Sequence, residues 1–408
     1  MIMQDNEKKP ALRFKGFTDP WEQRKLEEYL EVSGQKNFEG IYTKEDVLSV
    51  SGDFGIVNQI EFQGRSFAGA SVANYGVVET GDIVYTKSPL KSNPYGIIKA
   101  NKGKNGIVST LYAVYKPKQS VNPEFVQIYF EQDARMNNYM HPLVNKGAKN
   151  DMKVSAENAL KGQIVFPDIK EQRTISEFFR NLETLITLHQ RKYEKLVNIK
   201  KSMLNKMFPP NGASVPEIRF KGFTDPWEQR KLKELYFQLT ERNTDLLPYQ
   251  KTLSVATMSF KTDGNGAADT SLANYKRLRT GDIAFEGHTS KEFRYGRFVL
   301  NDVGDGIMSP RFSALRPLHE MPINFWKYYI HYEPIMRKVL VNSTKAGTMM
   351  NELVINDFLQ GSILVPSMAE QQAIGRFFKQ LDTLITLHQR KLEKLQNIKK
   401  SCLEKMFV

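Results

Sequence analysis

A long segment without proline occurs twice in this chain and constrains its fold more than any other feature. Residues 169–207 and 368–406 share the unchanged stretch Thr-Leu-Ile-Thr-Leu-His-Gln-Arg-Lys, at 184–192 and again at 383–391. Leu, Lys, Glu, Gln and Ile dominate both copies, and these residues are good or tolerable helix formers. Each copy therefore predicts a single helix about 55–60 Å long, at a rise of about 1.5 Å per residue.

Apolar residues in both segments recur every seven positions, which is typical of a coiled coil. We interpret two rows on each helix as the seam that the helices bury against each other. The seam residues are Ile175, Phe178, Leu182, Leu185, Leu196 and Ile199 in the first helix, and Ile374, Phe377, Leu381, Leu384, Leu395 and Ile398 in the second. His189 and His388 hold equivalent seam positions, either as a polar layer that sets the register or as side chains that reach solvent. Two unrelated core helices are the alternative interpretation.

The duplication extends from the helices to the whole chain. Residues 13–26, which read Arg-Phe-Lys-Gly-Phe-Thr-Asp-Pro-Trp-Glu-Gln-Arg-Lys-Leu, return unchanged at 219–232. The element Thr-Gly-Asp-Ile at 80–83 returns at 280–283. The sequences between these shared pieces have diverged. We therefore expect two domains with the same structural framework and different exposed surfaces.

The predicted fold class is α/β (α+β), with two similar strand-rich domains separated by two long helices that form an antiparallel coiled coil, related by a pseudo-twofold duplication. Residues 80–85 and 107–115 have the β-branched and aromatic composition of strands, whereas 125–130 and 325–330 are expected to be short helices. The Pro-, Gly- and Ser-rich stretch at 209–216 predicts an exposed linker. The expected parts are a variable domain at 1–166, a helix at 167–208, the linker at 209–216, a second variable domain at 217–365 and a second helix at 366–408.

Charge and composition narrow the class of protein. The net charge is +13 and the pI about 9.4, which suits a polyanionic partner, most simply nucleic acid. The single cysteine, Cys402, excludes a disulfide framework and a cysteine-based zinc cluster, and it favours the reducing cytoplasm. We find no secretory signal and no apolar stretch long enough for a membrane span.

A search for catalytic motifs predicts no reaction in this chain. There is no Walker loop, no G-x-G-x-x-G after a strand, no H-E-x-x-H and no His/Cys spacing for a metal. The stretch 92–95, Ser-Asn-Pro-Tyr, slightly resembles the motif of amino-methyltransferases, but it lacks the second proline. We interpret it as a turn and expect no catalytic residue, cofactor or metal ligand here.

Basic and amide side chains concentrate in the divergent loops, where they can grip phosphates or read base edges. Any one of these lysines has the alternative role of a solvated surface residue, so the prediction rests on the set. The candidate DNA-binding residues are Arg65, Lys87, Lys91, Asn93, Lys99, Lys102, Lys104, Lys146 and Lys149 in the first variable domain, and His288, Lys291, Arg294, Arg297, Arg311 and Lys345 in the second.

Over essentially its full length, the chain resembles the specificity subunit of a bacterial type I restriction–modification system. The repeated opening at 13–26, the Thr-Gly-Asp-Ile element and the pattern Pro-x-x-x-Glu-Gln-x-x-Ile-x-x-Phe-Phe, at 167–179 and 366–378, carry the resemblance. It implies that each variable domain is a target recognition domain for half of a bipartite double-stranded DNA site. It also implies that the helices form a spacer and the docking surface for two methyltransferase subunits.

The resemblance further implies S-adenosylmethionine on the methyltransferase subunits, and ATP on restriction and translocase subunits. None of that chemistry is expected in this chain, and no family motif identifies individual base contacts. Two other functions are considered. The first is a self-sufficient adenine DNA methyltransferase, which would need a methyl-donor site that the sequence lacks. The second is a coiled-coil scaffold that binds only protein. Such a scaffold would not bind DNA, even in complex with its partner.

Overall fold

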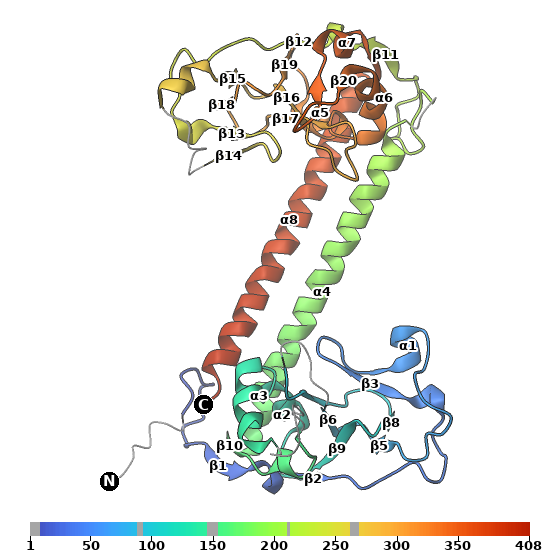
Figure 1. Ribbon diagram of the computed structural model, residues 1–408, viewed down its shortest axis with the longest axis vertical. Coiled ribbons are helices and arrows are strands. Elements are labelled where there is room, and N and C mark those ends of the chain that lie inside the picture. The colour runs from blue at the N-terminus through green and yellow to red at the C-terminus, as the bar shows by residue number, and fades with distance from the viewer. Residues whose placement is uncertain (1–8, 88–92, 145–153, 210–212, 262–268) are drawn as a thin grey trace. The chain divides into compact units, whose positions relative to one another are not determined.

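The computed structural model describes residues 9–87, 93–144, 154–209, 213–261 and 269–408, and the chain divides into two compact units (Figure 1). Unit 1 comprises 1–189 and 391–408, and unit 2 comprises 190–390. Both are mixed α/β, which confirms the predicted class at that level. The sequence analysis treated each long helix as a separate part of the chain, at 167–208 and 366–408. Instead, each helix divides between the units, because its two halves pack against different globular cores.

Unit 1 is built around a four-stranded antiparallel sheet of order β2-β9-β6-β7. Smaller antiparallel pairs, β1 with β10, β3 with β4 and β5 with β8, surround it. The predicted strand at 107–115 is in fact two strands separated by a turn, whereas the predicted helix at 125–130 is confirmed as α2. The elements are β1 (Glu22–Lys25), β2 (Leu30–Val32), β3 (Leu48–Ser51), β4 (Gly55–Asn58), α1 (Gln59–Gln63), β5 (Gly76–Val78), β6 (Ile83–Thr86), β7 (Ile97–Ala100), β8 (Gly106–Val108), β9 (Tyr112–Pro117), α2 (Pro123–Tyr129), α3 (Asp133–Met140) and β10 (Gln163–Phe166).

Unit 2 repeats this plan with a four-stranded antiparallel sheet of order β12-β19-β16-β17. The predicted short helix at 325–330 is confirmed as α5. A hairpin, β20 with β21, follows α6. The elements are β11 (Glu228–Lys231), β12 (Tyr236–Gln238), β13 (Leu253–Ser254), β14 (Ser259–Phe260), β15 (Lys276–Leu278), β16 (Ile283–Glu286), β17 (Arg297–Leu300), β18 (Gly306–Met308), β19 (Ala314–Pro317), α5 (Ile323–Tyr329), α6 (Glu333–Ser343), β20 (Thr344–Lys345), β21 (Glu352–Leu353), α7 (Ile355–Gln360) and β22 (Ser362–Val365).

The repeated Thr-Gly-Asp-Ile element builds the same turn before the central strand of each sheet. Gly81 has φ +94° and Gly281 has φ +96°, which is the left-handed region that glycine enters without strain. The carboxylates of Asp82 and Asp282 each accept a hydrogen bond, 2.7 Å long, from the main-chain N–H three residues earlier. The motif is therefore a structural device that starts β6 and β16.

The two predicted long helices are confirmed as α4 (Ile169–Met207) and α8 (Met368–Lys405). In unit 1 the first half of α4 packs against the last part of α8, where Lys399 Nζ lies 2.9 Å from Glu183 Oε1. In unit 2 the second half of α4 packs against the first part of α8, where Lys200 Nζ lies 2.6 Å from Asp382 Oδ1. Within each unit the helix segments are thus antiparallel (Figure 1).

The prediction that every seam residue is buried is wrong for three of them. Leu185, Leu384 and Ile398 are 46%, 43% and 37% exposed. Phe179 and Phe378, which directly follow the predicted seam residues Phe178 and Phe377, are at most 1% exposed. The reason is tertiary: Phe179 and Phe378 are clamped in the aromatic cores of their units, and these cores decide which helix face turns inward. Of the other predicted seam residues, Ile175, Leu182, Ile374 and Leu381 are buried, and Phe178, Leu196, Ile199, Phe377 and Leu395 are half-buried.

The repeated opening clamps the two helices together in each unit. In unit 1, Arg13 Nε and Nη2 donate to the two carboxylate oxygens of Glu171 at the start of α4, both at 2.7 Å. The adjacent Leu12 N–H donates to the carbonyl of Lys405 at the end of α8, at 2.8 Å. The opening thus holds the start of one helix beside the end of the other.

Unit 2 contains the same clamp with the two helices exchanged. Arg219 donates to both oxygens of Glu370 at the start of α8, at 2.6 and 2.7 Å. The Ile218 N–H donates to the carbonyl of Lys206 at the end of α4, at 2.9 Å. Glu171 is fully buried and the Glu370 side chain is 1% exposed, so each carboxylate depends on its arginine for charge compensation.

We predict that Arg13→Ala destabilises the protein by about 3–5 kcal/mol, because it leaves a buried carboxylate without its partner. The free energy of unfolding, measured in urea by circular dichroism, tests this. The matched control is Arg24→Ala, which breaks exposed ion pairs with Glu22 and Glu28 and should leave the free energy of unfolding nearly unchanged. Equal effects of the two substitutions would contradict the role of the clamp.

Candidate nucleic-acid interface

Three of the predicted basic residues of unit 1 are exposed on loops. Arg65 follows α1 and places its guanidinium over the Phe67 ring, 4.6 Å from the centroid. Lys102 and Lys104 lie in the loop between β7 and β8, and Lys102 makes a long ion pair of 3.9 Å with Glu124. These three predicted residues are available to an external anion.

Other predicted residues of unit 1 do not belong to an exposed face. Asn93 is 7% exposed, and its Nδ2 donates to Asp133 Oδ1 at 2.9 Å, so it ties the segment before β7 to α3. Lys99 is also 7% exposed and lines a cavity of about 510 Å³, because the whole of β7 is buried. The structure thus contradicts the prediction that these two are surface contacts. Lys87 is half-buried, with Nζ donating to the Thr110 carbonyl at 3.1 Å. Lys91, Lys146 and Lys149 lie outside the described residues.

Burial also changes the acidity of Lys99. Removal from water lowers the pKa of its ammonium group below 10.5, while the nearby Glu131 carboxylate acts in the opposite direction. A lysine in this setting contributes a destabilising buried charge at neutral pH. Lys99 therefore lowers the stability of the folded protein, whereas an exposed phosphate-binding lysine would not.

In unit 2 the structure brings several predicted residues together on two segments. His288, Lys291 and Arg294 are exposed on the loop between β16 and β17, and Lys345 is exposed on β20. Arg297 is partly buried at the start of β17, where it lies 3.8 Å from the Glu286 carboxylate. Arg311 is exposed on the loop before β19, with its guanidinium 4.7 Å from the Phe312 ring centroid.

Sequence reasoning missed three residues of this region. Glu286 is buried, and its carboxylate accepts hydrogen bonds from the His288 main chain at 3.1 Å and ring at 2.5 Å, which orients the histidine. Asn351 and Met349 belong to the hairpin tip between β20 and β21. A search for basic side chains had no signal for a carboxylate, an amide and a thioether, because their role depends on the neighbouring loop.

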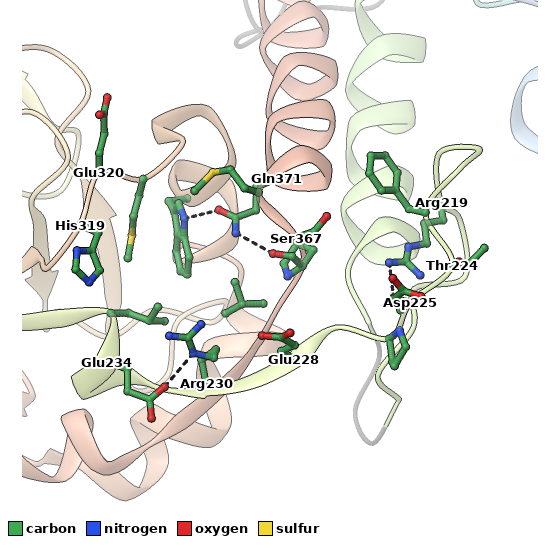
Figure 2. Close-up of a pocket in the computed structure, with 18 of the residues that line it drawn as sticks. Arg219, Thr224, Asp225, Glu228, Arg230, Glu234, His319, Glu320, Ser367 and Gln371 are labelled. Atoms are coloured by element: carbon green, nitrogen blue, oxygen red, sulfur yellow. Dashed lines mark hydrogen bonds and ion pairs between the residues drawn. The ribbon is translucent and has the colours of Figure 1, made fainter.

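A second hollow, of about 420 Å³, lies at the opening motif of unit 2 (Figure 2). Its rim carries the carboxylates Asp225, Glu228, Glu234 and Glu320. Its arginines are engaged, Arg219 with Glu370 and Arg230 with Glu234 at 2.9 Å. Further in, Trp326 Nε1 donates to Gln371 Oε1 at 3.0 Å. The excess of carboxylates repels a phosphate, so this hollow is not the nucleic-acid face.

The described part of the chain contains no cluster of three or more His, Cys, Asp or Glu side chains that could hold a metal ion. None of the helices described there has the length and apolar character of a membrane span.

Exposed cations lie on diverged loops of two equivalent α/β frames, and this arrangement suits the class of nucleic-acid recognition proteins. Residues 225–397 match the family described as "Type I restriction modification DNA specificity domain", and the unmatched first half repeats the framework motifs of this region. Through these residues and over nearly its whole length, the chain is similar to the specificity subunits of type I restriction–modification systems. Its function is DNA recognition within such a complex, and this family does not itself catalyse methylation or cleavage.

Similar proteins span nearly the whole chain. The "Putative type I restriction enzyme MjaX specificity subunit" of Methanocaldococcus jannaschii is 20% identical over 414 residues, covering 94% of this chain and 91% of that protein. The S subunit structure from M. genitalium is 11% identical with a TM-score of 0.52 and covers 98% of this chain and 99% of its own. The HsdS subunit from Thermoanaerobacter tengcongensis is 15% identical with a TM-score of 0.44, covering 95% and 96%.

We predict that Lys99→Met raises the free energy of unfolding at neutral pH, because the apolar side chain carries no buried charge. The folded-state pKa of Lys99 is depressed, so its penalty is complete at pH 7 and is relieved as the pH rises toward 10.5. The advantage of the variant should therefore shrink at alkaline pH. Urea unfolding at pH 7 and pH 10 tests this, with the exposed Lys102→Met as control. Lower stability of Lys99→Met at pH 7 would contradict the prediction.

Proposed function

We propose that each unit reads one half of a bipartite double-stranded DNA target, while the long helices set the spacing and bind the methyltransferase subunits. The proposal is supported by the contrast between structural elements that are the same in both units and surface side chains that differ. The turn at Thr-Gly-Asp-Ile and the Arg–Glu clamp are the same in both units. An equivalent exposed position nearby differs in charge, since Lys102 corresponds to Asp302. One frame with two sets of side chains would select two different half-sites.

The chemistry of the exposed residues suits this role. The guanidinium groups of Arg65 and Arg294 can form paired hydrogen bonds with guanine edges in the major groove, whereas Lys104, Lys291 and Lys345 can hold phosphates. The net charge of +13 adds a sequence-independent attraction that weakens as the salt concentration rises. Base contacts would thus select the sequence after the overall charge has brought the chain to DNA.

The helices carry an apolar surface that supports binding of two copies of one partner. Leu185 and Leu188 on α4 are 46% and 44% exposed, and the equivalent Leu384 and Leu387 on α8 are 43% and 44% exposed. These four residues lie in the stretch that is unchanged between the copies. We assign each leucine pair to one methyltransferase subunit, which would supply S-adenosylmethionine and transfer the methyl group to adenine. Restriction and translocase subunits would supply ATP hydrolysis and DNA cleavage.

Mapping of methylated adenines across the genome of a cell that expresses this chain with its methyltransferase subunit tests the proposed function. We expect a single motif with two defined halves and an unspecified gap. Arg294→Ala should relax one half only, because it removes a unit 2 contact worth about 1–3 kcal/mol, and Arg65→Ala should relax only the other. If either substitution alters both halves, the units do not read independently.

We predict that the double substitution of Leu185 and Leu188 by serine removes one of two bound methyltransferase subunits, because it replaces one apolar docking face with hydroxyls. Native mass spectrometry of the assembled complex measures the stoichiometry. The control is Leu111→Ser, which alters a leucine that is also exposed, at 59%, on the loop between β8 and β9. Retention of both subunits by the double variant would exclude this face as the docking site.

A further inference from the structure

Two segments of unit 2 are joined by their main chains into one surface. They are the loop 287–296 between β16 and β17, and the tip 346–351 of the hairpin formed by β20 and β21. The Asn351 N–H donates to the Gly287 carbonyl at 2.9 Å, and Asn351 Nδ2 donates to the Arg294 carbonyl at 3.3 Å. A Cβ at Gly287 would lie 2.0 Å from the Asn351 carbonyl oxygen, so only glycine allows this approach. We call the joined segments the loop–hairpin surface.

The hairpin tip displays a methionine. Met349 is 82% exposed, the highest value among the exposed large hydrophobic residues of the described chain, where the next are 71%. The turn around it is tight, since a Cβ at Gly347 would lie 2.3 Å from the Met350 carbonyl oxygen. The tip thus presents the thioether to solvent while its neighbouring backbone is held in place.

The same surface is cationic. Lys291 and Arg294 are exposed on it against one exposed carboxylate, Glu292, while the exposed Lys345 and Glu352 flank the hairpin tip. The Glu286 carboxylate is already engaged by His288 and by Arg297. The occupant that fits such a surface is therefore an anion that also offers an apolar group to Met349.

Double-stranded DNA has this combination in its major groove. The phosphates supply the charge, and the only methyl group at a base edge there is the 5-methyl of thymine. Methionine suits the contact because its side chain is flexible and its sulfur polarisable. We infer that Met349 is a specificity-determining residue that packs on a thymine methyl in the half-site read by unit 2, with Asn351 as the positioning residue of the tip. This inference rests on the proposed function.

The test replaces each thymine of the mapped target by deoxyuridine, which lacks only the methyl group, and measures binding by the complex of this chain with its methyltransferase subunit. At one thymine in the unit 2 half-site, loss of the methyl should weaken binding about four-fold, the effect of one buried methyl group. With Met349→Ala, the same replacement should have no effect. Met349→Leu, which keeps an apolar side chain, should restore the dependence.

Met368→Ala is the matched control, because Met368 is also exposed, at 50%, but lies at the start of α8. It should retain the full response to deoxyuridine. The inference is overturned if no position depends on the side chain at 349, or if Met349→Ala weakens methyltransferase binding instead of DNA binding. Failure of the wild-type complex to bind the mapped target would instead overturn the proposed function.

Discussion

The pairing of a buried carboxylate with an arginine of the opening motif is the interaction on which the rest of the structure depends. Glu171 and Glu370 stand in the first turns of the two long helices, where a carboxylate also suits the helix dipole. Each is bound through both oxygens, by Arg13 or Arg219. Because the residue before each arginine bonds to the end of the other helix, one short motif holds two helix ends together in each unit.

This clamp explains why the opening is copied while the loops are not. A buried charge tolerates no change in its partner, so the motif stays the same in both units. The loops at the strand ends have no such constraint, and their side chains are free to differ, as Lys102 and Asp302 do. A conserved frame and variable loops are what a recognition subunit needs, since a new target then requires changes only at exposed positions.

Local sequence patterns predicted the elements well where the signal was long or repeated. The bounds of α4 and α8 were predicted within three residues, because a run of about forty helix-forming residues outweighs a local exception such as Gly375. The prediction of 107–115 as one strand was wrong, since β-branched and aromatic residues fill both β8 and β9 and the turn between them has no glycine or proline. Basic composition identified Arg65 and Arg294 as exposed candidates but could not distinguish them from the buried Lys99.

The sequence by itself determined the duplication, the two helices, the class of fold and the family, because these depend on patterns that repeat along the chain. Tertiary structure alone decided which helix face is buried. Leu185 and Ile186 are both apolar, and the packing of Phe179 in the core of unit 1 leaves Leu185 exposed and Ile186 half-buried. It also decided that Asn93 is structural and that Asn351 joins the loop 287–296. These roles depend on contacts between residues far apart in the chain, which no local pattern records.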